Sequence, residues 1–199
     1  MNHYLPSIMS IRTIISLPDP LLRKVSTPLT NIDGATKALA LDMLETMYDA
    51  PGIGLAAVQI GITQRIVTVD LARGDDPKDP HIFINPEIIW TSDALNEYEE
   101  GCLSIPDYHE IVVRPSKVGV RWLDLDGNPN ERELDGLFAT CIQHEIDHLD
   151  GVLFIDHISS LKRNMILRKL LKARKEKERD EAEGNPSAKD QAKDPEHAL

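Results

Sequence analysis

The chain's strongest candidates for chemistry are two histidines and a glutamate in the segment QHEIDHLDG, residues 143–151. On a helix, His144 and His148 lie one turn apart on the same face, so both imidazoles can bind one metal ion. Glu145 is then placed to accept a proton from a water molecule on that metal. This pattern predicts a metal-dependent hydrolase, which usually needs a third protein ligand and one open position.

The third ligand has to come from outside this pair of histidines. Phe154 stands where one class of such hydrolases has a third histidine, and a phenyl ring binds no metal. Cys141 lies about 7.5 Å along the helix axis from the level of the metal, whereas a cysteine reaches only about 5 Å. His157 is a weaker alternative, because it follows the helix-ending Gly151. Cys102 is therefore the expected ligand, and a thiolate with two imidazoles suits Zn²⁺ or Fe²⁺.

The composition favours one globular domain outside the secretory pathway. The chain has 199 residues, of which 41% are hydrophobic and 28% charged. We find no signal peptide pattern, and no run approaches the roughly 18 apolar residues of a membrane span. Cys102 and Cys141 are the only cysteines, and both are expected to be reduced. These features predict a cytoplasmic protein that does not associate with membranes.

The elements that position these residues are expected to be helices and antiparallel hairpins, segregated along the chain. Such segregation predicts the α+β class. Capping residues, glycines and β-rich runs give the boundaries. Helices are expected from Asp33 or Thr36 to about Asp49, from Asp135 or Thr140 to Gly151, and from about Ser159 to Glu178, and strands at 65–71, 82–89, 111–113, 117–125 and 131–134.

Charge is distributed unevenly along the chain, whose net charge is −11. Residues 1–161 carry 11 Lys and Arg against 25 Asp and Glu, whereas residues 162–179 carry 9 against 2. A basic segment on an acidic chain can bind phosphates, so it indicates a nucleic-acid-rich partner. We expect one catalytic domain over 1–180, with 1–8 as an N-terminal extension and 159–180 as a C-terminal helix. The polar tail 181–199 is expected to be disordered.

Three segments together resemble the motifs of peptide deformylases, in the same order. They are GIGLAAVQ (52–59), EGCLS (100–104) and QHEIDHLDG (143–151), and the resemblance covers roughly residues 11–175. A lone HExxH is a weak signal, but three ordered motifs are specific. The resemblance implies the deformylase fold, in which mixed and antiparallel sheets pack around the histidine-bearing helix, together with an N-terminal and a C-terminal helix.

The resemblance also implies a function and its residues. Peptide deformylases remove the formyl group from the N-terminal formyl-methionine of new proteins and release formate. The implied cofactor is one Fe²⁺ per chain, which Zn²⁺, Ni²⁺ or Co²⁺ can replace. The implied partners are formyl-methionyl nascent peptides. The basic charge of 162–179 adds the ribosome as an expected partner. No DNA and no membrane is expected, and the protein is expected to be a monomer. Rival functions are a zinc endopeptidase and a non-catalytic, metal-stabilised ribosome-binding module.

The residue roles implied by the resemblance fall into two groups. Around the metal, Glu145 is expected to transfer protons, and the Gln59 side chain and the Leu103 backbone N–H are expected to donate hydrogen bonds to the oxyanion. The metal ligands are Cys102, His144 and His148. Around the substrate, Gly54 is expected to lie beside the substrate backbone, and Glu100 and Arg114 are expected to form a supporting ion pair. The methionine side chain is expected to contact Ile53, Leu137 and Cys141. One departure is Asp107-Tyr108-His109, where some relatives carry an arginine; His109 and His81 are expected to be surface or packing histidines.

Overall fold

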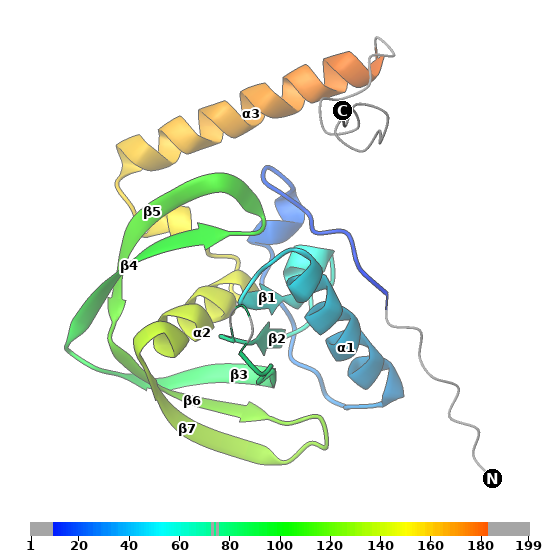
Figure 1. The fold of residues 1–199 in the computed structure, drawn as a ribbon, viewed down its shortest axis with the longest axis vertical. Coiled ribbons are helices and arrows are strands. Elements are labelled where there is room, and N and C mark those ends of the chain that lie inside the picture. The colour runs from blue at the N-terminus through cyan, green and yellow to red at the C-terminus, as the bar shows by residue number, and fades with distance from the viewer. Residues whose placement is uncertain (1–9, 73, 75, 183–199) are drawn as a thin grey trace. The chain divides into compact units, whose positions relative to one another are not determined.

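Helix α2 (Gly136–Leu149) carries the two histidines of the sequence motif and lies in the middle of the strands around it (Figure 1). The computed structural model describes residues 10–72, 74 and 76–182. The chain divides into two units, 1–158 and 159–199, and the first contains α2 and the strands. The expected extension at 1–8 and all but two residues of the expected tail at 181–199 lie outside the described residues. One catalytic domain over 1–180 stays a prediction.

The described elements agree with the α+β class. Among the described residues, no helix is both long and apolar enough to cross a membrane. The other helices are α1 (Gly34–Asp49) and α3 (Ser160–Ala182), with 3₁₀ turns η1 (Pro20–Arg23), η2 (Ala57–Ile60) and η3 (Phe154–Asp156). The strands are β1 (Gly54–Ala56), β2 (Ile66–Val69), β3 (His81–Thr91), β4 (Leu95–Cys102), β5 (Ile105–Pro115), β6 (Lys117–Leu123) and β7 (Pro129–Asp135).

The helix boundaries follow local chemistry. Asp33 is the N-cap of α1, where its carboxylate accepts a hydrogen bond from the Thr36 backbone N–H at 2.9 Å. Helix α2 ends at Leu149, two residues before the expected Gly151. Gly151 has φ +73°, and a side-chain carbon there would lie 2.6 Å from the Arg23 carbonyl oxygen. Both its conformation and its close contact therefore require glycine after the helix.

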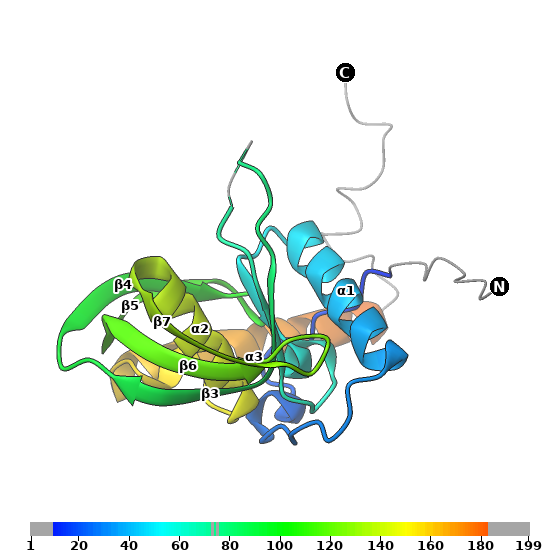
Figure 2. The ribbon, with the colours of Figure 1, turned by 90° about the horizontal axis from the view of Figure 1, so that it is seen from below.

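Five strands form an antiparallel sheet in the order β1-β2-β3-β6-β7. Figure 1 places β1 and β2 between α1 and α2. Because side chains alternate along a strand, Ile66 belongs to the core around α1, and Val67 and Val69 to the core around α2. Both faces of these strands are thus covered. Strands β3, β6 and β7 lie beside α2 when the molecule is seen from below (Figure 2).

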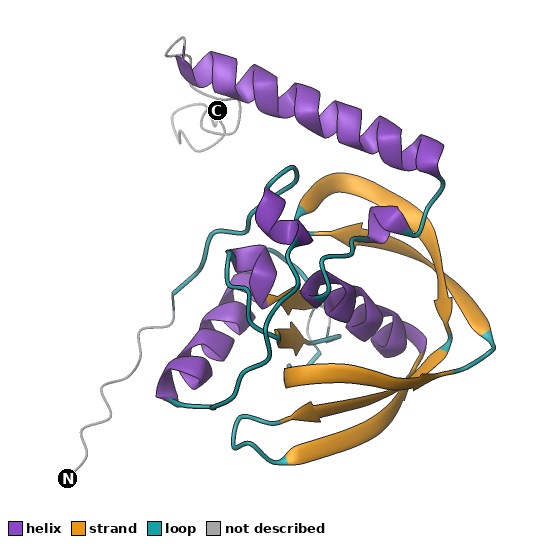
Figure 3. Ribbon diagram, turned by 180° about the vertical axis from the view of Figure 1, so that it is seen from behind, coloured by secondary structure: helices purple, strands orange, loops and turns teal. Residues whose placement is uncertain are grey.

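Strands β4 and β5 pair only with each other, as a separate antiparallel ribbon. Their register is regular from Leu95↔Pro115 to Gly101↔His109 and then shifts between Gly101 and Cys102. This irregularity turns the end of β4, and with it Cys102, out of the regular ladder. In Figure 3 the orange strands of the ribbon and of the large sheet lie around the purple helix α2. Strand β4 was absent from the expected elements, and β5 is longer than the expected 111–113.

Candidate active site

The three expected metal ligands come together from two elements of the fold. Cys102 lies at the end of β4, and His144 and His148 lie one turn apart on α2. One ligand atom from each of the three residues lies within 4.8 Å of the others. The Cys102 Sγ is 3.2 Å from His148 Nε2, and the two imidazole centroids are 5.0 Å apart. One thiolate and two imidazoles at this spacing suit a tetrahedral Zn²⁺ or Fe²⁺ with one open position.

The orientations of the histidines also fit a metal. His144 Nδ1 lies 2.9 Å from Glu100 Oε2, which leaves its Nε2 for the cluster. Such a carboxylate behind a histidine ligand fixes its tautomer and orientation. His148 Nδ1 and Glu145 Oε2 are buried atoms without a hydrogen-bond partner among the described residues. Buried polar atoms are normally paired, so the unpaired Glu145 oxygen is expected where a water or substrate group belongs, whereas His148 faces the cluster through its other nitrogen, Nε2.

The rejected ligand candidates lie elsewhere. Cys141 is a free, buried thiol whose Sγ is 3.7 Å from the Ile53 carbonyl oxygen, and it belongs to the pocket wall. His157 Nε2 is 2.7 Å from Asp147 Oδ2. Phe154 is buried and stacks on His144, with ring centroids 6.3 Å apart and an interplanar angle of 20°. The phenyl ring thus contacts a candidate ligand at the position where other zinc hydrolases place a third histidine.

Glu145 has an environment suited to moving protons near neutral pH. Burial raises the pKa of its carboxyl to about 7, with the positive charge of His144 opposing the shift and Glu100 adding to it. A general base with such a pKa works efficiently at neutral pH. The carboxylate lies against Gly54: a side-chain carbon there would overlap it and lie 2.9 Å from Cys141 Sγ. Glycine is therefore required by space at position 54.

Gln59 is buried at 1% exposure, although its residue type alone would favour the surface. Its Oε1 accepts a hydrogen bond from the Ala56 backbone N–H at 2.8 Å. This contact assigns the amide nitrogen to the other side, where it donates to Ser104 Oγ at 3.3 Å and Cys102 Sγ at 3.7 Å. Two donor hydrogens are therefore held beside the candidate metal ligands. Leu103 lies next to Cys102 and lines the same pocket.

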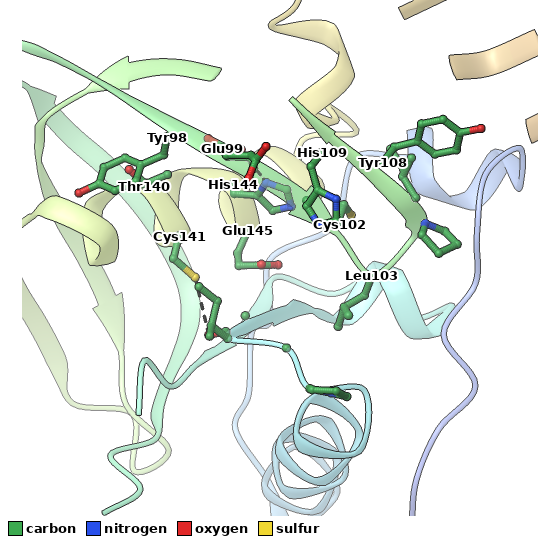
Figure 4. A pocket seen from close by; sticks show the side chains of 18 of the residues that line it. Tyr98, Glu99, Cys102, Leu103, Tyr108, His109, Thr140, Cys141, His144 and Glu145 are labelled. Carbon is green, nitrogen blue, oxygen red and sulfur yellow. Dashed lines mark hydrogen bonds and ion pairs between the residues drawn. The ribbon is translucent and has the colours of Figure 1, made fainter. Parts of the chain in front are cut away.

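A pocket of about 440 Å³ opens beside these residues. Its wall includes the three residues expected around methionine, Ile53, Leu137 and Cys141. Figure 4 shows Cys102, His144 and Glu145 close together, with Cys141 to the left and His109 beside Cys102. The expectation for His109 was incomplete, because its ring lies over Gly101 and lines the pocket. No sequence signal marked this position, because it follows from the Gly101↔His109 pair between β4 and β5, which residue types do not encode.

Glu100 and Arg114 form the expected ion pair, and both are buried. Arg114 donates to both Glu100 oxygens, from Nε at 2.6 Å and from the second terminal nitrogen at 3.0 Å. Burial alone would raise the pKa of Glu100, but His144 and Arg114 outweigh it and lower that pKa. Removing one partner of such a buried pair costs about 3–5 kcal/mol, because the other charge is left unpaired. The pair therefore holds the carboxylate that orients His144.

Comparisons with known proteins agree with this geometry. The family model described as polypeptide deformylase matches residues 11–164. A curated relative named peptide deformylase from Mesorhizobium japonicum is 58% identical over 169 residues, covering 85% of this chain and 96% of the relative. The relative of that name from Brucella suis is 57% identical, covering 82% of this chain and 94% of the relative.

Solved structures give the same result for the fold. A peptide deformylase from Legionella pneumophila superposes with a TM-score of 0.78 at 46% identity, covering 85% of this chain and 99% of that one. One from Ehrlichia chaffeensis in complex with actinonin gives 0.78 at 37% identity, covering 83% and 98%. The sheets around α2 are therefore an arrangement already known from these structures.

Proposed function

The chain belongs to the polypeptide deformylase family, and on that premise we propose that Cys102, His144 and His148 bind its catalytic metal. The protein is a hydrolase that removes the N-formyl group from newly synthesised proteins and releases formate. Its family consists of metalloenzymes. The observation that carries the proposed site is the convergence of one thiol and two imidazoles beside the buried carboxylate of Glu145.

The residues divide the reaction between them. A divalent metal at the three ligands supplies a Lewis acid that lowers the pKa of water toward neutrality. Glu145 accepts the proton of the attacking water and delivers it to the leaving amine. The Gln59 amide nitrogen and the Leu103 backbone N–H donate to the formyl oxygen as negative charge develops on it.

The substrate is held by the pocket beside these groups. The methionine side chain packs against the apolar wall formed by Ile53, Leu137 and Cys141. Gly54 lines the pocket beside the substrate backbone, and its lack of a side chain leaves the space that the Glu145 carboxylate occupies. Glu100 and Arg114 do not contact substrate in this proposal; they hold His144 in place.

We propose Fe²⁺ as the metal used in the cell. A lone thiolate with two imidazoles binds both Fe²⁺ and Zn²⁺, and the general affinity order favours Zn²⁺. Resemblance to the family supports iron, with Zn²⁺, Ni²⁺ or Co²⁺ as replacements. Oxidation of the iron or of the Cys102 sulfur is then expected to remove activity in air.

A direct assay tests function and metal together. Protein loaded with Fe²⁺ under anaerobic conditions is expected to release formate from formyl-Met-Ala-Ser, faster than the Zn²⁺ form, and to lose that advantage in air. The metal-free protein is the control. No formate release with either metal would overturn the function, whereas equal rates and equal stability in air would overturn only the assignment of iron.

The rival functions lack support. A zinc endopeptidase of the extended class needs a metal ligand at position 154, where the chain has Phe154. A structural metal site normally has four protein ligands. The described residues provide a cluster of three, next to a buried glutamate and a pocket.

We further propose that α3 docks the enzyme on the ribosome, where its substrate emerges. The support is charge: nine basic residues in 162–179 belong to a chain of net charge −11. Arg168, Lys172 and Lys175 are exposed and spaced four and three residues apart, which places them along one side of the helix. The strongly acidic remainder disfavours DNA. Monomeric state and a cytoplasmic location are proposed with it.

Charge reversal on α3 tests this docking. Changing Arg168, Lys172, Arg174 and Lys175 to Glu is expected to reduce co-sedimentation with ribosomes, while hydrolysis of a free formyl-Met tripeptide stays unchanged. Because phosphate contacts release counterions, wild-type binding should weaken steeply with salt.

A matched control reverses four exposed basic residues of the first unit, Lys24, Lys117, Arg121 and Arg132. It changes the net charge by the same amount and should keep ribosome binding better than the α3 variant. Equal co-sedimentation of wild type and the α3 variant at low salt would contradict the proposal.

A further inference from the structure

The short segment before α3 contacts the candidate metal site in two independent ways. Phe154 of η3 stacks on the His144 ring from within the core. His157, the residue after η3, lies 2.7 Å from the Asp147 carboxylate on α2. Asp147 stands between the metal-site residues of the helix and was assigned no role from the sequence. One face of His144 is thus packed by this segment, and the segment's last residue contacts the helix that carries His144.

A continuous chain of charged hydrogen bonds leads from His157 back to His144. His157 and Arg114 share one oxygen of Asp147, at 2.7 Å and 2.8 Å. Arg114 uses its other two nitrogens for Glu100, at 2.6 Å and 3.0 Å. Glu100 accepts from His144 Nδ1 at 2.9 Å. Every contact in the chain therefore has hydrogen-bond geometry, and each charged group lies between groups of opposite charge or a histidine.

The residues joined by these hydrogen bonds are buried near His144 and become more exposed toward His157. The side chains of Arg114 and Glu100 are each 5% exposed, whereas Asp147 is 24% and His157 33% exposed. The inner ion pair is therefore fixed by its surroundings, since neither charge can reach water. Asp147 can turn toward solvent, and His157 is the contact on its outer side that holds it toward Arg114.

We propose that His157 is a positioning residue for the metal site, acting through Asp147, Arg114 and Glu100 on His144. The inference rests on the proposed role of His144 as a metal ligand. Without His157, Asp147 is anchored by Arg114 alone and gains solvent-exposed rotamers. Arg114 then loses a fixed partner for one of its three contacts, and the Glu100 carboxylate that orients His144 is held less rigidly. Partners behind a histidine ligand change metal affinity or activity by about 10- to 100-fold.

The experiment measures metal retention rather than turnover alone. Because His157 acts through three further groups, His157→Ala is expected to speed chelator-driven loss of Zn²⁺ by about 3- to 10-fold, below the range for direct partners. The visible absorption of the Co²⁺-loaded protein should change as the geometry at His144 loosens. His157→Gln, whose amide nitrogen can still donate to Asp147, should restore both properties. A residue with only a general structural role would change the thermal stability of the metal-free protein and leave the Co²⁺ spectrum unaltered.

His81 supplies a matched control. Its Nε2 pairs with Asp79 at 3.1 Å, and its side chain is 32% exposed, but neither residue belongs to the metal cluster. His81→Ala should therefore leave metal release unchanged. Release from His157→Ala at the wild-type rate, or failure of His157→Gln to restore it, would overturn the positioning role while leaving the proposed function intact. A wild-type protein that binds no metal would overturn both, and metal analysis of the wild type distinguishes the two cases.

Discussion

Glu145→Ala is expected to lower kcat by about 100-fold or more, because general acid–base catalysis typically contributes that factor or a larger one. Metal content should stay near one ion per chain, since Glu145 lies outside the group of Cys102, His144 and His148. The buried carboxylate has a pKa of about 7, so it can exchange protons at neutral pH, which alanine cannot. Formate release and metal analysis of the same preparation measure the two outcomes.

The control for this variant is Glu87→Ala, which removes an exposed glutamate from β3, outside the pocket. It should match wild type in both rate and metal content. Loss of metal from Glu145→Ala would contradict the proton-transfer role and assign Glu145 to the metal instead. Retained metal with undiminished turnover would show that another group carries the protons.

Cys102→Ala should abolish both stoichiometric metal binding and formate release. Two imidazoles on one helix remain, but a catalytic site of this kind needs three protein ligands to hold its ion. Dialysis against a chelator followed by metal analysis measures the loss. The variant should keep the wild-type far-ultraviolet circular dichroism, because Cys102 is the last residue of β4, and its Sγ contacts the site residues Gln59 and His148 and belongs to neither hydrophobic core.

Cys141→Ser is the matched comparison, because Cys141 is the second thiol of the chain and lies in the pocket wall outside the metal cluster. We expect it to retain metal. If Cys141→Ser loses metal and Cys102→Ala keeps it, the assignment of the third ligand is wrong.

Much of the fold could be predicted because local signals were strong. The cap at Asp33, the histidine-bearing helix after Asp135 and the hairpin near Gly127 all agree with the structure. Strand β4 could not be predicted, because its sequence LNEYEEGC holds three glutamates, a residue type depleted in strands. The side chain of one of them, Glu100, pairs with Arg114 on β5 and with His144 on α2, which are 14 and 44 positions away in the sequence. Tertiary ion pairing therefore outweighs local preference in this strand.

The part of the site that depends on spacing within one helix could be predicted from the sequence. The helical spacing of His144 and His148 indicated a metal, and reach along the helix axis excluded Cys141. Three other features depend on strand register and on the path of the chain after α2. They are the burial of Gln59, the position of the His109 ring over Gly101 and the contact of His157 with Asp147. Such contacts join residues far apart in the sequence, and residue types alone do not encode them.

The separation of the candidate ligands along the chain has a consequence for the unfolded protein. Cys102 and His148 are 46 residues apart, so a metal held by both closes a long loop. In polymer terms this is a cross-link, and closing a loop of this length with a covalent bond would remove about 4 kcal/mol of conformational entropy from the denatured ensemble. The metal would thus join the separate two-stranded ribbon β4–β5 to helix α2. A metal ion that remains bound to the denatured chain limits how far that chain can expand, as a reversible counterpart of a disulfide.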